Sequence, residues 1–265
     1  MLQKPEYLAT ECAESFKDRS VVEAYRHRPP YPAEIFEILV ELMKGEPRRV
    51  LDVGCGRGDV ARNLVERVDG IDAVDFSEYM IEKGKSLLNG NHPGLHWLHG
   101  RVEEVTLNPP YALVTAGESV HWMDWNIVLP RFRDVLVPGG YLALVQRNTL
   151  PDPWFETLKE IIPRYSTNPK YQPYDMLEAW ERHGLFHKVG ERNTAPIPFM
   201  QSVEDYIEHY HSRSSFSRER MGPENAAAFD QEARRILEDV SNDGMLSLQV
   251  VGHIVWGNPG HQVAR

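Results

Sequence analysis

Short apolar segments alternate with segments of helical periodicity between residues 48 and 147. The apolar segments predict strands and the segments between them predict helices. The predicted strands are 48–54, 70–76, 95–101, 111–117 and 141–147, and the predicted helices are 59–68, 77–88 and 126–136. Parallel strands need a crossover connection, which a helix of this length provides. The alternation therefore predicts an α/β fold with a doubly wound, Rossmann-like, mainly parallel sheet.

Local signals refine these boundaries. Asp59 and Ser77 precede helical segments and are expected to cap them, and the Pro-Gly-Gly sequence at 138–140 is expected to turn the chain before the fifth strand. Residues 32–44 carry apolar side chains at helical spacing after Pro32, so an amphipathic helix is expected there.

The alternation is flanked by segments of different character. Residues 1–31 are expected to form an N-terminal arm or lid, frayed over its polar first twenty residues, before a core at 32–149. Residues 150–245 predict a mostly helical insertion that caps the site and adds one strand near 187–199. The last strand is expected at 245–257, almost wholly within the final part of the chain, 246–265. Together with the five core strands and the strand near 187–199, it completes a seven-stranded sheet.

Composition excludes several classes of protein. The net charge of -10 disfavours a broad nucleic-acid interface, and no apolar run is long enough for a signal peptide or a membrane span. Only Cys12 and Cys55 are present, which favours a reducing, cytoplasmic setting. The spacing of His92, His96 and His99, without acidic ligands nearby, predicts no metal site.

The first strand runs into a glycine-rich turn, Asp52-Val53-Gly54-Cys55-Gly56-Arg57-Gly58. Glycines after a strand let backbone N–H groups approach a ligand, and in open α/β sheets ligands bind at this edge. The turn therefore predicts a cofactor loop. Asp52 either accepts hydrogen bonds from the loop or, through water, from an ammonium group of the ligand, or it only holds the turn in place.

A carboxylate closes the second predicted strand. Asp75 stands 17 positions after Gly58, where a carboxylate can accept hydrogen bonds from both hydroxyls of a ribose. The alternative is that Asp75 only caps the helix that begins after Ser77.

These segments resemble the class I S-adenosylmethionine-dependent methyltransferases over residues 48–147. The family's D-x-G-x-G-x-G motif is matched by DVGCGRG, its acidic second motif by VDFSEYMIEKG and, loosely, its third by HGRVEEV. The resemblance implies S-adenosylmethionine as the cofactor, in contact with Asp52, Gly54, Cys55, Gly56, Asp75, Val102, Glu103 and Gly117. Arg101 departs from the pattern, because an aspartate is common at that position.

Phe76 and Met80 either cover the adenine ring or belong to the core. The phrases YRHRPPYP and HWMD resemble those of trans-aconitate-type methyltransferases. That narrower resemblance implies that Tyr25, Arg28 and Tyr31 form a lid over the methionine end of the cofactor, with Arg28 near its carboxylate. The alternative is an arm that only packs across the edge of the sheet.

The acceptor is expected to be a small molecule with a carboxylate or hydroxyl group. A carboxylate needs an arginine for orientation, with Arg147, Arg192 and Arg213 as candidates, and the insertion is expected to contact the acceptor through residues 209–220. A hydroxyl benefits from a base, and His121 after the fourth strand is the catalytic candidate. His121 is equally compatible with aromatic packing, as are Trp122, Met123 and Trp125.

Two other functions remain open at this level. An NAD(P)-dependent oxidoreductase also has glycines after its first strand and an acid after its second, although the position of Asp52 relative to Gly54 favours the sulfonium cofactor. A binding module could keep the cofactor motifs without transferring a methyl group.

Overall fold

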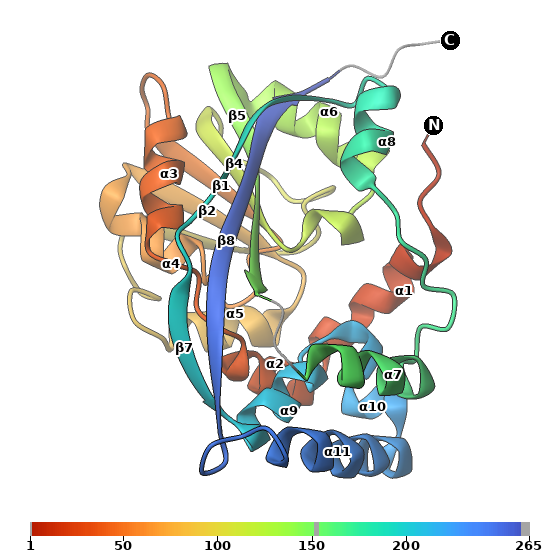
Figure 1. Ribbon diagram of the computed structural model, residues 1–265. Coiled ribbons are helices and arrows are strands. Elements are labelled where there is room, and N and C mark those ends of the chain that lie inside the picture. The colour runs from red at the N-terminus through yellow and green to blue at the C-terminus, as the bar shows by residue number, and fades with distance from the viewer. Residues whose placement is uncertain (1, 151–153, 261–265) are drawn as a thin grey trace.

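The computed structural model describes residues 2–150 and 154–260, apart from the side chains of residues 10 and 11 (Figure 1). The strands are β1 (Arg49–Val53), β2 (Gly70–Asp75), β3 (Leu95–His99), β4 (Tyr111–Gly117), β5 (Leu136–Thr149), β6 (Phe186–Asn193), β7 (Ile197–Ser202) and β8 (Met245–Pro259). The helices of the core are α3 (Glu34–Leu42), α4 (Ala61–Leu64), α5 (Glu78–Lys85) and α6 (Trp125–Val135), with short 3-10 turns η4 (Val65–Arg67) and η5 (Val120–Trp122).

The strands form one sheet in the order β3-β2-β1-β4-β5-β8-β6, with β7 also paired to β8. Strands β1 to β5 are parallel, and β8 runs antiparallel to β5, β6 and β7. The order of strands reverses between β1 and β4, so the loops that follow these two strands diverge and leave space for a ligand. This arrangement confirms the Rossmann-like, mainly parallel sheet.

The described sheet has eight strands, so the predicted count of seven is wrong. The segment expected as one strand at 187–199 is divided into β6 and β7, which pair with successive parts of β8. The break falls at Thr194, whose hydroxyl accepts a hydrogen bond from the Gly252 N–H at 2.8 Å. Pro196 lies in the same break and has no N–H to donate, which explains why regular pairing stops there.

Alternate residues of the buried strands point to opposite faces of the sheet. Leu142 and Leu144 of β5 belong to a cluster with α6, whereas Ala143 and Val145 belong to a cluster with α3 and α4. Both faces are therefore covered by apolar helices, as expected for parallel strands.

The N-terminal arm is folded, contrary to the expected fraying. It forms η1 (Glu6–Leu8), α1 (Thr10–Ala13), η2 (Glu14–Lys17), α2 (Arg19–Ala24) and η3 (Tyr25–His27). Val21 and Val22 are buried against Met80 of α5, and the Ser77 hydroxyl donates to the Phe16 carbonyl at 2.7 Å. Contacts with a distant part of the chain therefore order the arm.

Two other local predictions need correction. Asp59 does not cap α4; its carboxylate pairs instead with Arg57 at 3.1 Å and Arg62 at 2.9 Å. Residues 138–140 lie inside β5, because pairing with β4 begins at Leu136 and continues past an irregularity. Ser77 does cap α5, accepting a hydrogen bond from the Met80 N–H at 3.4 Å.

Most of the insertion is helical. It contains α7 (Phe155–Tyr165), α8 (Met176–Arg182), α9 (Val203–His211), η6 (Ser214–Phe216), α10 (Arg218–Met221) and α11 (Pro223–Glu238). Four of them, α7, α9, α10 and α11, gather at one end of the long β8 around a separate apolar cluster that includes Phe229, Tyr210 and Leu248 (Figure 1). Parts of the predicted segments, 151–153 and 261–265, lie outside the described residues. No helix in the described ranges has both the length and the apolar composition needed to span a bilayer.

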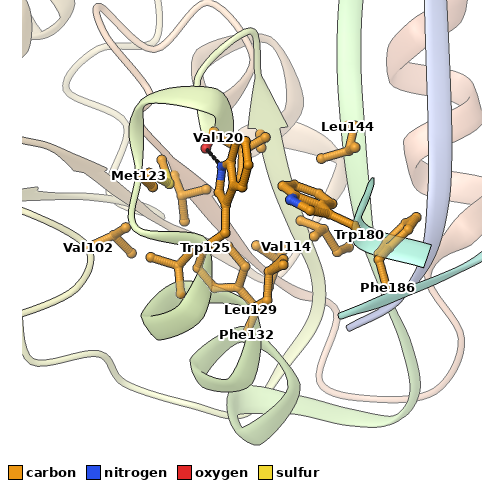
Figure 2. Packing of buried hydrophobic residues seen from close by; sticks show 14 of the residues in the cluster. Val102, Val114, Val120, Met123, Trp125, Leu129, Phe132, Leu144, Trp180 and Phe186 are labelled. Carbon is orange, nitrogen blue, oxygen red and sulfur yellow. Dashed lines mark hydrogen bonds between the residues drawn. The ribbon is translucent and has the colours of Figure 1, made fainter. Parts of the chain in front are cut away.

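Helix α8 lies apart from that group and packs against the sheet. Figure 2 shows Trp180 of α8 beside Phe186 and Trp125, and the Trp125 indole N–H donates to the Val120 carbonyl at 2.9 Å. The two tryptophan rings meet edge to face at 5.5 Å and both are fully buried. Trp180 Nε1 has no hydrogen-bond partner among the described residues.

We expect Trp125→Phe to destabilise the protein by about 1–2 kcal/mol more than Trp180→Phe, measured by urea denaturation. Both substitutions remove similar buried volume, but only Trp125→Phe breaks a hydrogen bond, while Trp180→Phe removes a buried donor that lacks a partner. In Trp125→Phe the Val120 carbonyl still accepts a hydrogen bond from the Met123 N–H, which limits the difference in stability between the two variants. A larger loss for Trp180→Phe would contradict this account of the cluster.

Candidate functional site

A cavity opens at the carboxyl ends of β1, β2 and β4, where the order of strands reverses. We call it the first cavity. All the residues predicted to contact the cofactor line it: Tyr25, Arg28, Asp52, Gly54, Cys55, Gly56, Asp75, Phe76, Met80, Val102, Glu103 and Gly117. Parallel pairing brings the strand ends to one edge, and the N-terminal arm supplies the opposite wall.

The glycines after β1 let the loop pass close to its neighbours. Gly54 has a φ of +60°, and a Cβ there would lie 2.5 Å from the Cβ of Ser119. Gly56 has a φ of +55°, and a Cβ there would meet nothing nearer than Tyr25 at 4.0 Å. Because both Gly56 and Tyr25 line the cavity, a side chain at position 56 would occupy space that a ligand could use.

The Asp75 carboxylate connects the loop after β1 to the end of β2. It accepts hydrogen bonds from the Gly56 N–H at 2.7 Å and the Ser77 N–H at 2.8 Å. Burial raises the pKa of Asp75 to about 6, although these hydrogen bonds favour the ionised form. The two oxygens retain acceptor capacity on the cavity side, which suits a pair of hydroxyl donors.

Asp52 occupies a different environment in the same cavity. Its carboxylate accepts from the Thr115 hydroxyl at 2.8 Å and the Ala61 N–H at 3.2 Å, and Thr115 is its partner in the pairing of β1 with β4. Burial raises the pKa of Asp52 to about 7. The carboxylate therefore holds the start of α4 against β4, and it also faces the cavity.

The third predicted motif also lines the first cavity. Val102 and Met80 are buried, and Phe76 is half-buried with the Arg101 guanidinium 5.3 Å from its ring. Arg101 also pairs with Glu14 of the arm at 2.6 Å. The arginine that departs from the family pattern thus connects this wall to the N-terminal arm.

The arm closes the cavity with aromatic and cationic side chains. The Arg28 guanidinium lies 4.0 Å from the Tyr25 ring and 3.3 Å from the Glu118 carboxylate, and Arg147 lies 4.3 Å from the Tyr31 ring. Tyr31 lines the cavity together with Tyr25 and Arg28. The residues expected in a lid therefore lie over the cavity.

A second cavity adjoins the first and shares six lining residues with it. The shared wall consists of Phe16, Tyr25, Arg28, Glu118, Trp122 and Arg147. His121 lines only the second cavity, and burial lowers the pKa of its imidazole to about 4. Helix α9 contributes His209 to the second cavity, and Arg213 follows shortly after that helix.

The arginines considered for an acceptor carboxylate separate into two groups. Arg147 and Arg213 line the second cavity. Arg192 does not line either cavity; it lies on β6 and pairs with Glu41 at 2.8 Å. Because β6 pairs with β8 at the outer side of the sheet, Arg192 lies away from both cavities and is no longer a candidate for orienting an acceptor carboxylate.

Two residues of the shared wall, Phe16 and Glu118, were not predicted from the sequence. Phe16 lies in the arm, and Glu118 follows β4 with a φ of +53°, a conformation uncommon outside glycine. Glu118 contacts Arg28 at 3.3 Å and Arg147 at 3.5 Å. Its place directly after a strand of the sheet was the available signal. Trp122 and Met123 line the first cavity, whereas Trp125 belongs to the core.

Within the described ranges, no group of three or more histidine, cysteine, aspartate or glutamate side chains is arranged to hold a metal ion. The residues that line the two cavities are suited to an organic ligand with hydroxyl, aromatic and charged groups.

A family model described as a methyltransferase domain matches residues 50–140. An uncharacterized methyltransferase of Mycobacterium tuberculosis is 37% identical over 149 residues, covering 55% of this chain and 58% of that protein. The trans-aconitate 2-methyltransferase of Streptomyces avermitilis is 29% identical, covering 51% of this chain and 52% of that protein. The chain thus spans between half and three fifths of the length of these relatives.

A solved structure assigned as a type II methyltransferase, from Anaeromyxobacter dehalogenans, has the same fold, with a TM-score of 0.64 and 21% identity. The similarity covers 88% of this chain and 97% of that one. The strand order, the family match over residues 50–140 and the names of these relatives all indicate the same type of domain. Residues 50–140 therefore match a methyltransferase domain, and the chain as a whole has the fold of that solved methyltransferase structure.

Proposed function

We propose that the protein binds S-adenosylmethionine in the first cavity and transfers its methyl group to a small-molecule acceptor in the second cavity. The observation that carries the proposal is the wall shared by the two cavities, which would bring the two ligands next to each other. Holding two reactants in contact supplies much of the rate acceleration in a reaction of this kind.

The residues of the first cavity fit this cofactor. Asp75 offers a buried carboxylate for the ribose hydroxyls, and Gly56 leaves open the space beside it. We assign Val102, Glu103, Phe76 and Met80 to the adenine end. Arg28, with Tyr25 and Tyr31, would contact the methionine end, where its guanidinium matches a carboxylate.

In this proposal each segment of the chain has its own role. Residues 1–31 act as a lid, residues 32–149 bind the cofactor, residues 150–245 cap the acceptor site, and residues 246–265 contribute the last strand. The contacts between the arm and α5 and the separate apolar cluster of the insertion support this division.

When bound, S-adenosylmethionine supplies a methyl group that its sulfonium already activates for transfer. The protein then has to orient an acceptor oxygen, of a carboxylate or a hydroxyl, and exclude water. His121 is neutral near pH 7 because burial lowers its pKa to about 4. A neutral imidazole can orient the acceptor or take a proton from a hydroxyl, whereas a carboxylate acceptor needs no base. One relative is named for trans-aconitate, so an acid is among the acceptors to test.

We expect S-adenosylhomocysteine to bind with micromolar affinity and NAD not to bind, measured by calorimetric titration. Asp75→Ala should lower the affinity for S-adenosylhomocysteine by roughly ten- to a hundred-fold, because charge-assisted hydrogen bonds to the ribose are lost. The matched control is Asp134→Ala, which removes an exposed carboxylate of α6 that pairs with Arg133. Binding of NAD in place of S-adenosylhomocysteine would overturn the proposal in favour of an oxidoreductase.

The affinity for S-adenosylhomocysteine should also depend on pH. Because burial raises the pKa of Asp75 to about 6 and ribose hydroxyls donate to the ionised form, affinity should fall below about pH 6, approaching ten-fold per pH unit. Asp75→Asn should lose this part of the dependence and keep any contribution from Asp52, whose pKa is about 7. An affinity that rises on acidification would contradict a ribose contact by the carboxylate.

Replacement of the candidate catalytic residue should separate turnover from cofactor binding. We expect His121→Ala to lower kcat by roughly ten-fold or more while the Kd for S-adenosylhomocysteine changes less than about two-fold, because His121 lines only the second cavity. His187→Ala, which removes an exposed histidine of β6, is the control. Equal losses in turnover and cofactor affinity would exclude the assigned role. Binding without turnover against a panel of acids and alcohols would favour a binding module.

A further inference from the structure

Three nitrogen-bearing side chains of the second cavity have no partner. Among the described residues, the side chains of His121, His209 and Arg213 make no hydrogen bond and no ion pair, although all three line the cavity. Their contacts are with aromatic rings: His121 with Trp122, His209 with Tyr206 and Tyr210, and Arg213 with Tyr210 at 4.4 Å. Polar groups that face a cavity without partners are available to a ligand.

The charge around the second cavity is unbalanced. Three guanidinium groups line it, from Arg28, Arg147 and Arg213, and Glu118 is the carboxylate that lines it within the described part of the chain. Glu118 already contacts both Arg28 and Arg147. Arg213, exposed at the edge of the cavity, therefore adds a positive charge that no neighbouring carboxylate neutralises, in a chain whose net charge is -10.

His209 lies within the field of these cations. Burial, followed by the charges of Arg213, Arg28 and Arg147, lowers the pKa of His209 well below its ordinary range. The same field that disfavours a second proton on the imidazole favours an anion beside it. His209 and Arg213 both line the second cavity and both contact the Tyr210 ring, so they can contact one ligand group together.

We propose that the second cavity binds an acceptor with an anionic oxygen group, a carboxylate or a phosphate, which pairs with Arg213 and accepts a hydrogen bond from His209. The proposal deepens the proposed function, because it names the chemical class of the acceptor and rests on the same pair of cavities. It also assigns recognition of the acceptor to the cap, through α9 and the residues that follow it.

The test is a titration of the protein saturated with S-adenosylhomocysteine, at low ionic strength. The probes are acetate, succinate, citrate and inorganic phosphate, with acetamide and succinamide as uncharged counterparts of the first two. We expect saturable binding of at least one anion and none of the amides. Tighter binding of phosphate would identify a phosphorylated acceptor, and tighter binding of a carboxylate would identify an organic acid.

Variants locate the site. Arg213→Gln should lower the affinity for the bound anion by about ten-fold or more, and His209→Gln should lower it by a smaller factor. Neither variant should change the Kd for S-adenosylhomocysteine. Arg234→Gln is the matched control, because it removes the same charge from the cap at an exposed position that pairs with Glu204 at 2.7 Å. Anion affinity should stay within about two-fold of the wild type in this control.

Three results would overturn the inference: no saturable binding of any anion, equal binding of acids and amides, or equal losses in Arg213→Gln and Arg234→Gln. Each is distinct from failure of the proposed function, which would appear as absent S-adenosylhomocysteine binding before any anion is added.

Discussion

The buried Asp75 carboxylate is the interaction on which the arrangement of the site depends. Its two oxygens accept the N–H groups of Gly56 and Ser77, so one side chain holds both the glycine loop and the start of α5. Ser77 in turn caps α5 and donates to the Phe16 carbonyl, which anchors the N-terminal arm over the cavity. Loss of this carboxylate would therefore disturb the loop, the helix and the arm together.

A second constraint is the cost of keeping cations beside the half-buried histidines of the second cavity. Arg28 and Arg147 are partly neutralised by Glu118, which adopts a left-handed conformation at the end of β4 to reach both. His209 stays neutral in their field, and Arg213 is left unpaired. The chain as a whole is acidic, so this local excess of positive charge is a property of the site and has no counterpart in the overall composition.

Much of the core could be predicted from the sequence because its signals are local. Periodicity located β1, β2, β4 and α6 to within two residues, and the motif after β1 predicted the loop that lines the first cavity. The errors have non-local causes. The arm is ordered by packing of Val21 and Val22 on Met80, and the edge strand is divided where Thr194 bonds to Gly252 of β8. No window of sequence around residue 20 or 194 contains those partners.

The sequence alone determined the parallel core of the sheet, the glycine loop and the carboxylates that line the first cavity, since glycine and carboxylate placement after parallel strands is dictated by backbone geometry. The tertiary structure decided that His121 belongs to the second cavity and that Arg213, not Arg192, reaches it. The physical reason is distance along the chain. The second cavity combines the arm, the end of β4 and helix α9, and only packing of the helical insertion against the core brings these segments together.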